Sequence, residues 1–110
     1  MSKGSIFETA RAWIDGNEGE IAALTDRIWD YAEPSFCEIR SAKALCNLLA
    51  DKGFAVDMGV AQMPSAFVAS WGNGRPRIAV MCEYDATPGE TQGPFPYPHA
   101  LADRLSGFTD

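Results

Sequence analysis

The chain has 110 residues, about one small domain with room for a single modest core, and its 46% hydrophobic and 22% charged residues are ordinary for a globular protein. Nine basic residues against fifteen acidic ones give a formal net charge of −6. Nucleic acids and anionic membranes are bound through clustered basic side chains, and those of this chain are scattered, so the composition argues against both partners.

Two helices are expected before the first proline. A short one runs from about Ser5 to Ile14 and is closed by Asp15-Gly16. The second begins at Asn17, which can cap it, with Glu20 completing a capping-box pattern. Its apolar residues recur at helical spacing: Ile21, Leu24, Ile28 and Tyr31. Pro34 ends this helix, because the residue before a proline is disfavoured in the helical region.

A third helix is expected from near Cys37 to the residues before Gly53. Four apolar residues share one of its faces: Ala42, Leu45, Leu48 and Leu49. Gly53 occupies the position where a helix commonly ends with a left-handed residue, which glycine adopts without strain. The pattern therefore predicts an amphipathic helix with one face directed to the core.

Strands are expected next, because the apolar period changes from helical to two. Phe54–Val60 alternates as in a half-buried strand, Ala66–Trp71 forms a second, and Gly72–Gly74 makes a turn. Arg77–Tyr84 holds the continuous apolar run Ile78–Cys82, which is typical of a central strand buried on both faces. Helices followed by strands in this order predict an α/β sandwich whose sheet includes a hairpin.

A long loop rich in proline and glycine is expected after Asp85, and such a loop usually belongs to a functional site. The sequence then stops at Gly107–Asp110 without a helix or strand to complete the sheet. We therefore expect a domain that is cut short. Apolar surface around Ile78–Cys82 should be uncovered and should promote self-association.

The cysteines and the apolar stretches bear on the cellular compartment. Cys37, Cys46 and Cys82 are odd in number and lack CxxC spacing, so neither a disulfide framework nor a cysteine zinc finger is expected. The N-terminus has no apolar signal core, and no stretch approaches the roughly 18 apolar residues that span a bilayer. We expect a cytoplasmic, reduced protein.

Glu83 and Asp85 are the strongest candidates for chemistry. They lie at the carboxyl end of the expected central strand, and ligands bind outside such strand ends in open α/β sheets. Alternation along the strand puts both carboxylates on one side and Tyr84 on the other. Two carboxylates placed there can hold a cation or orient a metal ligand. The alternative is that both only solvate the start of the loop.

Three segments together resemble one enzyme family: Leu24–Glu33, Gly59–Ala69 and Glu83–Gly89. The family is that of the co-catalytic zinc peptidases and amidohydrolases, which includes aminoacylases and hippurate hydrolase. Within it the chain is most similar to the p-aminobenzoyl-glutamate hydrolase branch. The resemblance covers residues 21–92.

The resemblance implies that residues 1–110 are the N-terminal portion of a three-layer α/β/α catalytic domain with an incomplete sheet. Family members hydrolyse the amide bond of acyl- or aroyl-amino acids with a water bound to a pair of zinc ions. Their general base, most of their metal ligands and a smaller dimerisation domain lie downstream. We therefore expect a fragment that is inactive alone, from an enzyme that is a homo-oligomer and takes a small acyl-amino acid as substrate.

Four residues match or depart from the family's metal-site pattern. Asp85 matches an aspartate that steadies the site, and Glu83 stands where the family has a ligand histidine. A carboxylate can also ligate zinc. Asp110 falls where the family places a bridging residue, and a bridging carboxylate suits a two-metal site. Phe108 stands where related sequences often have histidine, and residues from Gly93 onward match the family poorly.

A second function from another class is compatible with the same sequence. The chain could be a stand-alone, non-catalytic binding or interaction module derived from the hydrolase fold. A reading frame that continues past Asp110 with a histidine and then a Glu-Glu pair favours the enzyme, and a stop codon favours the module.

Overall fold

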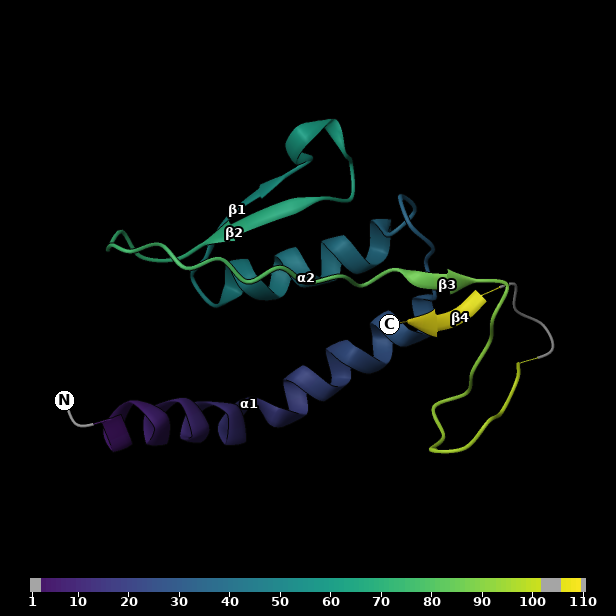
Figure 1. Cartoon of the computed structure of the whole chain (residues 1–110), viewed down its shortest axis with the longest axis horizontal. Coiled ribbons are helices and arrows are strands. Elements are labelled where there is room, and N and C mark those ends of the chain that lie inside the picture. Colours follow the sequence, from purple (N-terminus) through teal and green to yellow (C-terminus); the bar gives the residue numbers. More distant parts are fainter. Residues whose placement is uncertain (1–2, 102–105, 110) are drawn as a thin grey trace.

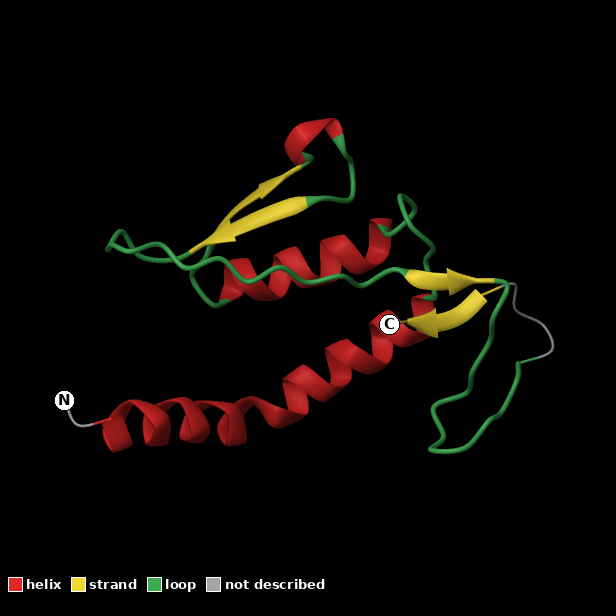
Figure 2. Cartoon of the chain, in the orientation of Figure 1, coloured by secondary structure: helices red, strands yellow, loops and turns green. Residues whose placement is uncertain are grey.

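The computed structural model of the chain describes residues 3–101 and 106–109. It has a mixed α/β architecture, which confirms the predicted class, with two helices and two small antiparallel sheets (Figure 1; Figure 2). The elements are α1 (Lys3–Tyr31), α2 (Ile39–Asp51), β1 (Ala55–Met58), the 3-10 turn η1 (Val60–Gln62), β2 (Phe67–Ser70), β3 (Ala86–Pro88) and β4 (Ser106–Thr109). No helix in this described part of the chain is both long and apolar enough to cross a bilayer.

Helix α1 is continuous, so the predicted break at Asp15–Asn17 is wrong. Asn17 does not cap a helix: its side-chain amide donates to the Trp13 carbonyl at 2.7 Å, one turn earlier. Its side-chain oxygen accepts a hydrogen bond from Lys52 Nζ at 3.1 Å, and Lys52 also pairs with Glu20 at 2.5 Å. These contacts with Lys52, which follows α2, stabilise the helix around Asn17, although an internal glycine lowers helix stability by about 1 kcal/mol relative to alanine.

The small core lies where the second half of α1 meets α2. Its apolar members are Leu24, Ile28, Ala32, Ala42, Cys46 and Ala86. The predicted stripe on α1 is thus confirmed at Leu24 and Ile28, whereas Ile21 is exposed. Gly53 follows α2 with a φ of +91°, in the left-handed region that the sequence predicted for it.

The predicted hairpin is confirmed. Strands β1 and β2 pair antiparallel from Ala55–Ser70 to Met58–Phe67, and both strands contact α2. Burial along β2 alternates, with Phe67 and Ala69 half-buried and Val68 exposed, as expected for a sheet covered on one face.

The prediction of a buried central strand at Arg77–Tyr84 is wrong. These residues form no regular strand, and Ile78, Val80 and Met81 are 88%, 83% and 90% exposed. An apolar run becomes a central strand only when strands flank it and layers cover it. Among the described residues no strand pairs with this run, and the exposure of its side chains shows that no layer covers it.

Two further corrections concern the C-terminal region. The expected loop after Asp85 begins instead with β3, which lies beside the C-terminal end of α1 (Figure 1). A strand does lie near the chain end, since β4 (Ser106–Thr109) pairs antiparallel with β3 and contacts α1, but it belongs to a second sheet and does not complete the sheet of β1 and β2. In the described part of the chain, the proline-rich stretch that follows β3 covers residues 89–101.

Candidate functional site

Asp85 lies between two residues whose positions are fixed. On one side Tyr84 Oη donates a hydrogen bond to the Ser65 carbonyl at 2.5 Å. On the other side the Ala86 amide donates to the Glu33 carbonyl at 2.8 Å, and Ala86 forms a parallel bridge with Pro34. Ala86 is fully buried, Asp85 is half-buried and Glu83 is exposed. The backbone therefore presents the Asp85 carboxylate at a defined place, where it makes no hydrogen bond or ion pair within the described residues.

Glu33 is a buried carboxylate that links this place to the start of α2. It is 7% exposed, and its two oxygens accept the Arg40 backbone amide at 3.0 and 2.9 Å. The Arg40 Nε also donates to it at 3.1 Å, and the guanidinium lies 4.6 Å from the centre of the Tyr31 ring. A carboxylate accepting a first-turn amide stabilises a helix N-terminus, because the helix dipole is positive there.

A second set of polar contacts joins α2 to β2 and the Asp85 segment. Ser65 Oγ donates to Glu38 Oε2 at 2.6 Å, while its carbonyl accepts the Tyr84 hydroxyl. The Tyr84 ring lies 6.0 Å from that of Phe67. Burial raises the pKa of Tyr84 to about 12, and the neighbouring Glu38 and Cys46 add to this effect. Tyr84 is therefore a neutral hydrogen-bond donor at physiological pH.

We expect Tyr84→Phe to lower the free energy of unfolding at pH 7 by about 0.5–1.5 kcal/mol, the usual worth of one intramolecular hydrogen bond. Because the pKa of Tyr84 is raised from 10 to about 12, its contribution is complete below pH 10 and disappears as pH rises through 12. Urea unfolding across this range should therefore show a shallower decline for the variant than for the wild type. The matched control is Tyr97→Phe, since Tyr97 is exposed; an equal change there would contradict the assignment.

Several of these residues were not singled out from the sequence. Glu38 and Arg40 belong to no motif, Glu33 and Ser65 fall within segments that resemble the hydrolase family but have no predicted role, and Tyr84 is predicted only to face away from the carboxylates. One signal was available: acidic residues shortly before a helix are favoured by its dipole, and Glu33 and Glu38 both precede α2.

Burial raises the pKa of the Cys46 thiol, which fits a packing role.

The described residues do not fit a complete zinc site by themselves. Zinc in proteins typically takes three or four protein ligands. In the described part of the chain no three histidine, cysteine, aspartate or glutamate residues come together, so Glu83 and Asp85 have no third ligand beside them. The third predicted residue, Asp110, lies outside the described residues.

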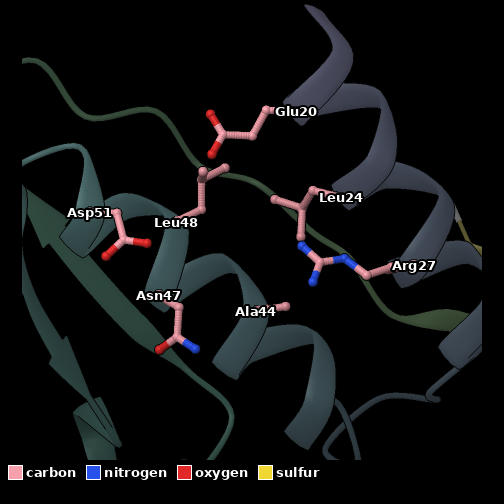
Figure 3. A pocket seen from close by; sticks show the side chains of 7 residues that line it. All are labelled: Glu20, Leu24, Arg27, Ala44, Asn47, Leu48 and Asp51. Carbon is pink, nitrogen blue, oxygen red and sulfur yellow. The ribbon is translucent and has the colours of Figure 1, made fainter. Parts of the chain in front are cut away.

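A separate groove of about 190 Å³ lies between α1 and α2 (Figure 3). Its lining is mostly polar, and Leu24 and Leu48 approach each other across it. The lining residues are Glu20, Leu24, Arg27, Ala44, Asn47, Leu48 and Asp51. Neither Glu83 nor Asp85 borders this groove, so it does not extend the predicted site.

Comparison with known proteins identifies a relative among the hydrolases. The chain is 40% identical over 79 residues to a subunit of the p-aminobenzoyl-glutamate hydrolase of Escherichia coli strain K12. The chain is related to that subunit. The matched residues make up 72% of this chain and 16% of the relative, so the chain corresponds to about one sixth of it. No family model and no solved structure matches the chain.

Proposed function

We propose that this chain forms the N-terminal part of the catalytic domain of a zinc-dependent amidohydrolase that cleaves acyl- or aroyl-amino acids, with p-aminobenzoyl-glutamate as the model substrate. The observation that carries the proposal is the 40% identity to the hydrolase subunit over 79 residues. The packing of α2 against one face of the β1–β2 hairpin supports assignment to a layered α/β/α domain.

In this proposal the Asp85 segment borders the metal centre. Asp85 orients a metal ligand, Glu83 serves as a ligand and Asp110 bridges the two ions. The fixed backbone on both sides of Asp85 supports the first of these roles, because a side chain that orients a ligand must itself be held in place. The described residues do not complete a zinc site, so the proposal assigns the remaining ligands to polypeptide outside these 110 residues.

The test uses a chimera in which the matched residues of this chain replace those of the E. coli subunit within the complete hydrolase. We expect the chimera to release p-aminobenzoate from p-aminobenzoyl-glutamate and the 110-residue chain alone, supplied with zinc, to release none. The control is a chimera carrying an unrelated segment of equal length. A folded but inactive chimera, or metal-dependent turnover by the isolated chain, would contradict the proposal.

A further inference from the structure

The 77–83 segment, defined as Arg77 to Glu83, is an extended stretch of chain with no partner in the described structure. Figure 1 shows it as an uncoiled trace between the β1–β2 hairpin and β3. None of its backbone amides or carbonyls takes part in a hydrogen bond with the described residues. Three of its apolar side chains, Ile78, Val80 and Met81, are more than four-fifths exposed. An extended segment with unpaired backbone and exposed apolar side chains is a template for strand pairing.

The charges around this segment are arranged symmetrically about Val80. Two arginines, Arg75 and Arg77, precede the apolar run, and two carboxylates, Glu83 and Asp85, follow it. Arg77 and Glu83 are equally far from Val80 along the chain, and so are Arg75 and Asp85. One end of the segment is therefore positive and the other negative, which is the pattern of a surface complementary to itself.

We propose that in the isolated 110-residue chain, where Glu83 and Asp85 hold no metal, the 77–83 segment pairs antiparallel with the same segment of a second copy, with a twofold axis at Val80. In this register Arg77 lies opposite Glu83 of the second copy, and Ile78 lies opposite its Cys82. Directly opposed cross-strand pairs of opposite charge stabilise a sheet, and like charges in those positions destabilise it. A twofold axis repeats each pair, as in other isologous interfaces.

Charge also selects this register over the alternatives. A parallel, in-register pairing would place Arg77 beside Arg77 and Glu83 beside Glu83. An antiparallel slip by two residues would keep only one kind of ion pair, either Arg77 with Asp85 or Arg75 with Glu83. The register centred on Val80 keeps both the Arg77–Glu83 pairs and the Arg75–Asp85 pairs. It also places Ile78, Val80 and Cys82 of each copy on one shared face.

Sedimentation velocity of the 110-residue chain tests the pairing. We expect a discrete dimer that Arg77→Glu and Glu83→Arg each weaken by roughly 10- to 100-fold, because two attractive pairs become repulsive. The double variant should return to within about 3-fold of the wild type, since the opposed charges are restored. Arg11→Glu is the matched control for Arg77→Glu. It makes the same change in net charge at an exposed position of α1 and should leave the dimer unchanged.

A second measurement reports the register directly. Opposed residues of an antiparallel pair have Cα atoms about 4.5–5.5 Å apart, within the range that a disulfide spans. In a Cys37→Ser, Cys82→Ser background, Val80→Cys should therefore cross-link two copies under mild oxidation. Val68→Cys, at another exposed valine on β2, should not. A monomer at all concentrations, large aggregates without a dimer, failure of the double variant to restore pairing, or equal cross-linking at both cysteines would overturn the proposal.

Discussion

Replacing Asp85 by asparagine in the hydrolase chimera is expected to lower amide hydrolysis by about 10- to 100-fold, the usual effect of removing a carboxylate that orients a metal ligand. The substitution keeps size and polarity and removes only the charge. Asp85 makes no hydrogen bond or ion pair with the described residues, so the fold should be retained. Activity on p-aminobenzoyl-glutamate and zinc content, measured on the same preparation, give the result.

Glu83→Gln is the paired variant, because Glu83 lies two residues earlier and is exposed. A loss comparable to that of Asp85→Asn would indicate that Glu83 ligates metal, and a small loss would indicate that it only solvates the segment. If Asp85→Asn keeps the chimera's unmutated rate and metal content, Asp85 does not belong to the metal site.

Glu33→Ala should lower the free energy of unfolding of the chain by about 2–3 kcal/mol, from the loss of a helix-capping acceptor and of charge-assisted hydrogen bonds. The Glu33 carboxylate accepts the Arg40 amide and the Arg40 guanidinium, and no other side chain among the described residues accepts them. Domains of this size are stable by only about 5–15 kcal/mol, so the loss is a large fraction of the total. Urea unfolding followed by circular dichroism measures it.

Arg40→Ala separates the two contributions to that loss. The Arg40 side chain is 63% exposed and its Glu33 partner 8%, so solvent screens this ion pair only in part, and the variant also loses the hydrogen bond from the guanidinium to the Tyr31 carbonyl. The Arg40 backbone amide is still present in the variant and still bonds to Glu33. We therefore expect a smaller loss than for Glu33→Ala. Equal losses would show that the ion pair, rather than capping of α2, is the main role of Glu33.

The elements that the sequence predicted correctly depend on neighbouring residues. The amphipathic pattern of α2, the left-handed Gly53 after it and the alternation in β2 are local features, and each is present in the structure. The predicted break in α1 is wrong because a distant residue decides the outcome. Lys52 occupies the Asn17 side-chain oxygen that a capping residue would have directed to its own helix.

The predicted central strand is wrong for a related reason. The run Ile78–Cys82 has the composition of a buried strand, but burial depends on partners that a local pattern does not contain. The candidate site was predictable only in part. Asp85 matches a family pattern, whereas its neighbours are held by the backbone carbonyls of Glu33 and Ser65, which are distant in sequence, and no local pattern predicts those contacts.

The hydrogen bond between Ala86 and Glu33 has a consequence for the order of folding. It closes a large loop that contains the whole of α2 and the hairpin, and closing a long loop costs more conformational entropy than forming the helix or hairpin inside it. We therefore expect those inner elements to form before the loop ends meet, and Asp85, next to the closing bond, to reach its position late.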